Sequence, residues 1–137
     1  CGPVMTMDRV NPPELAKPSG FPHAIVATGG KLVFLAGQTA QGPDGQIVGK
    51  GDVVAQFEQA LSNLLTALAG AGGTPDQLAK LTIYAVDPED YRNRVEAIGM
   101  VWRWLVGSTY PAMALVGITR LWDSDALVEL EGIAVLP

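Results

Sequence analysis

Cysteine and histidine are almost absent from this sequence of 137 residues, since each occurs once, as Cys1 and His23. A single cysteine excludes a disulfide bond within the chain, and the two residues are too few for the Cys/His ligand sets of zinc sites. A Ser-His-Asp triad would have to use His23, but no Gly-x-Ser-x-Gly motif presents a serine nucleophile. The sequence therefore predicts no metal site and no cofactor, and we interpret His23 as a loop residue.

Charged residues are also scarce, at 17% of the chain, and their sum is −5. The nine lysines and arginines are scattered rather than clustered, whereas a nucleic-acid partner requires a concentrated positive surface. We therefore expect no nucleic-acid partner. Hydrophobic residues make up 48% of the chain, which excludes a disordered protein and suggests that some apolar surface is buried in an oligomer.

Long apolar runs are missing as well, because no stretch approaches the ~20 residues that a membrane helix needs. No secretory leader is recognisable, so a cytoplasmic protein without a membrane partner is the expectation. Residues 1–4 resemble a cloning scar, because two methionines follow them at Met5 and Met7. With no internal repeat and no linker, residues 1–137 are expected to form a single domain.

Turn and capping residues divide the first half of the chain. Residues 24–27 and 32–36 are predicted strands, and the Gly29-Gly30 pair between them is typical of a two-residue hairpin turn. Asp52 is well placed to cap a helix that ends near Gly70. The apolar residues of this helix recur at helical spacing, at Val54, Phe57, Leu61, Leu64, Leu65 and Leu68.

The second half predicts a strand at 81–86, a second helix and two final strands at 114–119 and 127–136. Asp90 is a plausible cap for the second helix, which Gly107 would end. Its apolar face comprises Val95, Ile98, Trp102 and Leu105. This order of elements predicts an α+β fold in which two helices cover one face of a mixed sheet.

The most specific motif combines Tyr110-Pro111-Ala112-Met113 with the run Leu127-Val128-Glu129-Leu130-Glu131-Gly132-Ile133-Ala134. It resembles the C-terminal signature of the reactive-intermediate deaminase family, Rid or YjgF, in which a Pro-Ala-Arg step opens one strand and a Val-Glu-Ile-Glu-Ala-Ile-Ala run forms the next. The resemblance extends from about Asn11 to the end of the chain. It implies a chorismate-mutase-like fold, a homotrimer with ligand clefts between subunits, and hydrolysis of reactive imines and enamines.

The resemblance assigns four positions to that cleft. Gly37 matches the glycine of a Ser-Gly-Gln step, where the backbone approaches the ligand, and Phe21 stands at a family tyrosine. Glu129 matches a glutamate that positions the water or the transferring proton, and is the candidate catalytic residue. Met113 occupies the place of the arginine that binds the substrate carboxylate. A thioether cannot replace the donor fork of a guanidinium, so the cleft has a different chemistry here.

Alternation along the final strand gives a further reason to expect an oligomer. Side chains 127, 129, 131, 133 and 135 share one face, so Glu129 and Glu131 lie among three apolar residues there. A trimer whose sheets face one another would bury this mixed face and bring the two carboxylates close to a subunit boundary.

Two functions follow from this pattern. The first is a divergent Rid enzyme that hydrolyses a small imine, enamine or related compound without an arginine to bind a substrate carboxylate. The second is a non-catalytic trimer that binds an apolar metabolite or a protein partner. Met113 fits either function, as a lining residue of a remodelled cleft or as a packing methionine. Arg120 and the arginines of the second helix (Arg92, Arg94 and Arg103) are expected to lie outside the cleft.

Overall fold

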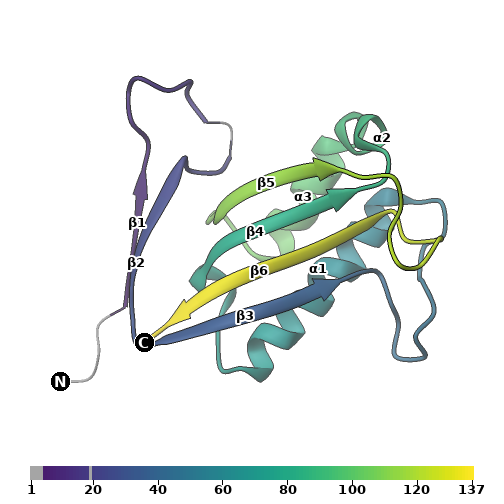
Figure 1. The fold of residues 1–137 in the computed structure, drawn as a ribbon, viewed down its shortest axis with the longest axis horizontal. Helices are drawn as coiled ribbons and strands as arrows, with labels where there is room; N and C mark the ends of the chain where they lie inside the picture. Colours follow the sequence, from purple (N-terminus) through teal and green to yellow (C-terminus); the bar gives the residue numbers. More distant parts are fainter. Residues whose placement is uncertain (1–4, 19) are drawn as a thin grey trace.

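The computed structural model describes residues 5–18 and 20–137, so the predicted scar at residues 1–4 lies outside the described residues. Strands β3 (Lys31–Gln38), β4 (Leu78–Ala85), β5 (Ala112–Gly117) and β6 (Val128–Leu136) form one sheet in the order β3-β6-β4-β5. β6 is antiparallel to both of its neighbours, and β4 and β5 are parallel. The sheet is therefore mixed, as the sequence predicted (Figure 1).

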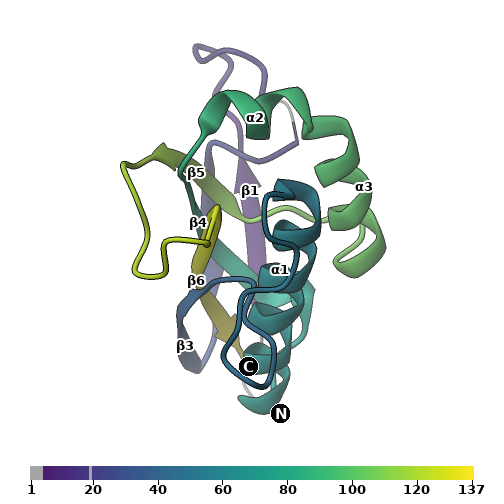
Figure 2. The ribbon, with the colours of Figure 1, turned by 90° about the vertical axis from the view of Figure 1, so that its right-hand side faces the viewer.

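The helices lie together on one face of this sheet (Figure 2). Helix α1 (Val53–Gly70) begins at Asp52, whose carboxylate accepts hydrogen bonds from the backbone N–H groups of Val54 and Ala55, so the predicted cap is confirmed. The helix buries one apolar stripe against the sheet, and this stripe forms the centre of the core. Its fully buried members are Phe57, Leu61, Leu64 and Leu68.

The predicted second helix consists of two helices, α2 (Pro88–Asn93) and α3 (Val95–Leu105), which meet at Arg94. The cap prediction was wrong by one turn. The carboxylate of Asp87 accepts the hydrogen bond from the N–H of Asp90, and Pro88 occupies the first helical position, where a missing N–H is harmless. α3 buries Ile98 and Trp102 as predicted.

The N-terminal region departs from the predicted hairpin. β2 (Ala24–Thr28) pairs with β1 (Thr6–Val10), a strand that sequence reasoning missed, and not with β3. A two-residue hairpin turn needs positive φ, and neither Gly29 nor Gly30 has it. Instead the N–H of Gly30 bonds to the carbonyl of Leu136, which continues the pairing of β3 with β6. The β1–β2 ribbon therefore stands apart from the four-stranded sheet (Figure 1).

The two faces of the sheet differ sharply in burial. On the helix face, Val128 and Leu130 of β6 and Leu81 of β4 are buried in the core. On the opposite face, Glu131 is exposed and Glu129 is half-buried. The alternation predicted for the final strand is therefore present, and the two carboxylates project away from the helices. No helix in the part of the chain that the structure describes is long and apolar enough to cross a membrane.

Candidate functional site

Gly37 and Glu129 lie against each other on the sheet face opposite the helices. The register between β3 and β6 shifts between Leu35 and Gln38, so Gly37 lies in a β-bulge. A Cβ atom at Gly37 would collide with the carboxylate of Glu129 and would stand 2.9 Å from its Cδ atom. Only glycine leaves room for the glutamate here, so the close approach explains the residue type.

A second carboxylate and a phenol extend this face. Tyr84 is paired with Glu129 across β4 and β6, and its hydroxyl donates a 2.7 Å hydrogen bond to Oε1 of Glu131. This bond raises the pKa of Tyr84 above its usual value, and the carboxylates of Glu131 and Glu129 raise it further. Tyr84 therefore stays protonated at neutral pH and keeps its hydrogen bond to Glu131.

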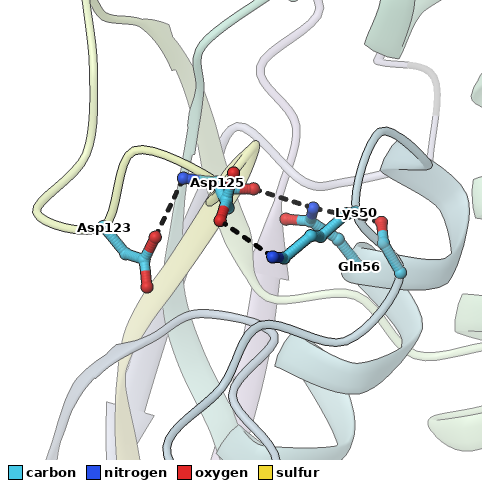
Figure 3. Close-up of polar contacts among 5 residues, drawn as sticks. Lys50, Gln56, Asp123 and Asp125 are labelled. Carbon is cyan, nitrogen blue, oxygen red and sulfur yellow. Dashed lines mark hydrogen bonds and ion pairs between the residues drawn. The ribbon is translucent and has the colours of Figure 1, made fainter.

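The start of β6 is fixed by Gln56, a fully buried polar residue of α1. Its amide nitrogen donates to the carbonyls of Gly49 and Asp125, at 3.2 and 3.0 Å, and its oxygen accepts from the N–H of Leu127 at 2.8 Å. An ion pair between Lys50 and Asp125 ties the same loop to the segment that precedes α1 at the surface, with 3.4 Å between nitrogen and oxygen (Figure 3). Because Leu127 precedes Glu129 by two residues, these bonds fix the position of the candidate catalytic carboxylate.

The aspartates of this loop form a turn. The N–H of Asp125 donates to the carboxylate of Asp123 at 2.9 Å, an interaction visible in Figure 3. Among the described residues no group of three or more His, Cys, Asp or Glu side chains could hold a metal ion.

Phe21 and Met113 come together in an apolar pocket on the helix side of the sheet. Its volume is about 350 Å³, within the range of small-molecule sites. Met113 reaches it from β5, and Phe21 from the loop that precedes β2. The other main contributors are Phe57, Tyr91, Ile98, Trp102, Tyr110 and Leu115.

Two aromatic contacts shape this pocket. The rings of Trp102 and Tyr110 stack with their centroids 5.4 Å apart, and the indole N–H donates to the carbonyl of Thr109. Tyr91 meets Phe57 edge-to-face at 6.1 Å, and burial raises the pKa of Tyr91 to about 12. The wall is therefore both apolar and uncharged at neutral pH.

The four predicted site residues thus fall into two pairs within one chain. Met113 pairs with Leu81, a core residue of the helix face, whereas Glu129 pairs with Tyr84, whose hydroxyl bonds to Glu131 on the opposite face. Strand β4 lies between β5 and β6, so Met113 and Glu129 are separated both across the sheet and through it. Only a second subunit could bring the two pairs into one cleft.

One arginine near the apolar pocket was missed by sequence reasoning. Arg9 of β1 donates from Nε to the carbonyl of Tyr110 at 3.1 Å, although 101 residues separate them. It lines a smaller pocket of about 240 Å³ together with Asn11 and Ser108, and this pocket shares Gly20, Phe21 and Tyr110 with the apolar one. The strand carrying Arg9 has no clear periodicity and follows a region interpreted as a scar, so few local signals predicted it.

The described residues that line the two pockets of the single chain do not include the other arginines considered above or His23. Arg120 donates to the carbonyls of Leu121 and Trp122, outside both pockets. Arg92, Arg94 and Arg103 are exposed on the helices. His23 is exposed too, and its ring bonds to the carbonyl of Ala16, which closes the loop before β2.

Comparison with known proteins places these features in context. The sequence profile described as endoribonuclease L-PSP matches residues 14–136. The RutC family protein slr0709 of Synechocystis is 34% identical over 136 residues, which cover 97% of this chain and 99% of that protein. The 2-iminobutanoate/2-iminopropanoate deaminase of Capra hircus is 30% identical over 83% of this chain and 80% of its own.

The fold has a similar counterpart among solved structures. The structure of YyfB from Yersinia pestis, described as a member of the conserved Rid protein family, superimposes with a TM-score of 0.83. It is 32% identical in sequence, and the alignment covers 95% of this chain and 98% of that one.

Proposed function

Because the chain belongs to the Rid (YjgF, endoribonuclease L-PSP) family, we propose that it hydrolyses a small imine, enamine or related compound in clefts between the subunits of a homotrimer. Glu129 is the proposed catalytic residue, and the backbone of Gly37 is proposed to contact the substrate. Support comes from the goat relative, whose name states that it deaminates 2-iminobutanoate and 2-iminopropanoate.

The contact of Gly37 with Glu129 is the observation that carries this proposal. A carboxylate beside an open glycine bulge can hold a water molecule close to exposed backbone groups. Glu129 would accept a proton from this water as the water oxygen adds to the carbon of the C=N bond, and would return that proton to the nitrogen to give a carbinolamine. Glu129 would then take the hydroxyl proton of the carbinolamine and pass it to the amino nitrogen as the C–N bond breaks, so that ammonia and a carbonyl compound leave.

The proposed substrate differs from that of an arginine-containing site. Met113 supplies no donor for a carboxylate, and in one chain it lies on the sheet face away from Glu129. Recognition in the cleft therefore has to rely on shape, backbone groups and apolar contact. This favours a substrate whose binding does not depend on a contact between its carboxylate and residue 113.

A second candidate is a trimer that binds an apolar metabolite, or a protein partner, without chemistry. The pocket lined by Phe21 and Met113 supports it, because its wall is made of aromatic and aliphatic side chains. This pocket needs no contribution from Glu129. Ligand binding there and hydrolysis at Glu129 are therefore separable by mutation.

Ribonuclease activity, which the name of the family model suggests, is not part of the proposal. The net charge is −5, and the single histidine, His23, bonds to a backbone carbonyl in the loop before β2. A site for RNA cleavage would need cations for the phosphates and a proton shuttle, and neither candidate pocket combines them.

The deciding experiment measures hydrolysis of 2-iminopropanoate and 2-iminobutanoate, generated in situ, by the wild-type protein and three variants. Glu129→Gln should lower any enzymatic rate at least about 100-fold, because the amide cannot accept the proton. Met113→Arg should increase turnover of these carboxylate substrates if the scaffold lacks only its anchor. Met113→Leu, which conserves volume, is the matched control and should leave the rate unchanged.

The outcomes separate the two candidates. Turnover that persists unchanged in Glu129→Gln would refute hydrolysis by this residue. Absence of turnover in the wild type and in Met113→Arg, together with a rise in melting temperature on adding apolar compounds, would support the binding protein instead.

A further inference from the structure

We propose that the polar pocket at Arg9 and the apolar pocket at Met113 form one site for a small organic acid with an apolar tail, its carboxylate held by Arg9. This inference rests on the ligand-binding role proposed above for the apolar pocket, and it is independent of hydrolysis at Glu129. It assigns a ligand class to the helix side of the sheet.

The two pockets adjoin along a shared wall. Gly20, Phe21 and Tyr110 line both of them, so one molecule can occupy the two spaces at once. Within the apolar part, the polar groups are backbone groups and the phenols of Tyr91 and Tyr110, and the Trp102 indole N–H is already bonded to Thr109. An apolar tail of aromatic or branched aliphatic character fits this lining.

The polar part offers donors and one positive charge. Arg9 uses Nε for the carbonyl of Tyr110, which holds the guanidinium at this pocket, and the N–H groups of its two Nη atoms remain as donors for a ligand. Asn11 accepts a hydrogen bond from the N–H of His23 through Oδ1, so its amide nitrogen is the end available as a donor. Ser108 adds a hydroxyl to the same wall.

Charge also favours an anion at this place. No aspartate or glutamate is among the described residues that line either pocket. A guanidinium held by a backbone carbonyl and accompanied by neutral donors is suited to a carboxylate, which it can bind with two parallel hydrogen bonds. An uncharged or cationic head group would leave this charge without a partner.

Within one chain the site is separate from the proposed catalytic pair. Arg9 reaches Tyr110, three residues before Met113, whereas Glu129 lies on the opposite face of the sheet. The bond from Arg9 also ties the β1–β2 ribbon to the segment that leads into β5. Binding of an acid would therefore strengthen the attachment of the ribbon.

Isothermal titration calorimetry with 4-phenylbutanoate and with 4-phenylbutan-1-ol tests the inference. The two probes share a tail and differ in charge. Arg9→Gln should weaken binding of the acid at least about tenfold and leave binding of the alcohol within about twofold, because only the acid uses the guanidinium. Arg120→Gln, a surface arginine outside both pockets, is the matched control and should change neither affinity.

Each result has a definite meaning. Equal losses for both probes in Arg9→Gln, or no loss for either, would overturn the role of Arg9 while leaving the apolar pocket as a binding site. Failure of the wild type to bind either probe at millimolar concentration would refute the ligand-binding role itself. Hydrolysis at Glu129 would stand or fall separately, by the imine assay.

Discussion

At the scale of single residues, the candidate catalytic site depends on a glycine. Gly37 is in a bulge of β3, and the carboxylate of Glu129 occupies the space where its side chain would be. The φ of Gly37 is not in the left-handed region, so an alanine could adopt the same backbone. The requirement for glycine here is therefore spatial rather than conformational.

Gly37→Ala should displace the Glu129 carboxylate and reduce imine hydrolysis by at least about tenfold, while costing only about 1 kcal/mol of stability, since the end of a flexible side chain can move. Gly70→Ala is the matched control, because a methyl group at that helix position would meet nothing within 4 Å. Hydrolysis rates and melting temperatures check both. Full activity in Gly37→Ala would contradict the role of the Gly37–Glu129 contact.

At the scale of elements, one buried glutamine joins a helix to the strand that carries the catalytic candidate. Gln56 links α1 to the carbonyls of Gly49 and Asp125 and to the N–H of Leu127. The bonds to Asp125 and Leu127 satisfy backbone groups of the loop before β6, and the bond to Gly49 satisfies one in the loop before α1. A buried backbone group left without a partner is costly, so the loop and the helix are expected to unfold together.

Gln56→Leu should lower the free energy of unfolding by about 2–4 kcal/mol, because a buried leucine of similar size cannot replace the hydrogen bonds to three partly buried backbone groups. Gln59→Ala in the same helix is the control. It removes one bond to Asn63 and should cost less than about 0.5 kcal/mol. Urea titrations measure both, and equal losses in the two variants would contradict the role assigned to Gln56.

At the scale of the whole molecule, the sheet face opposite the helices is incompletely covered. Leu32 and Phe34 of β3 are 63% and 72% exposed, and Val116 of β5 is exposed on the other edge. Glu129 and Glu131 lie between them, on β6. A single chain therefore presents to water an apolar surface that surrounds its candidate catalytic carboxylate, which is the arrangement expected of a subunit interface.

We expect a homotrimer at micromolar concentration, and Phe34→Glu should dissociate it by placing a charge in the interface. Trp104→Glu is the control, because Trp104 is 77% exposed on α3, on the other side of the molecule. Sedimentation equilibrium distinguishes the species. A monomeric wild-type protein, or a trimer that survives Phe34→Glu, would contradict this interface.

Local sequence signals predicted the elements that depend on neighbouring residues. The helical spacing of apolar residues from Val54 to Leu68 and the cap at Asp52 correctly predicted α1, because both signals depend only on residues within that helix and its first turn. The alternation of side chains along β6 correctly predicted that Glu129 and Leu130 lie on opposite faces of the sheet, because it too depends only on neighbouring residues. The cap predicted at Asp90 was wrong, because Asp87 caps α2 one turn earlier.

Three features were decided by tertiary structure alone. β2 pairs with β1 because the backbone at Gly29-Gly30 is held against Leu136 at the end of β6, over a hundred residues away. The hydrogen bond between Arg9 and Tyr110 forms because the β1–β2 ribbon places Arg9 beside the segment that leads into β5. The separation of Met113 from Glu129 follows from strand order, with β4 between them.

The sequence by itself determined the family, the helices and the faces of the strands, since these depend on local patterns and motifs. The neighbours of each site residue depend on pairing between distant segments, which no local pattern contains.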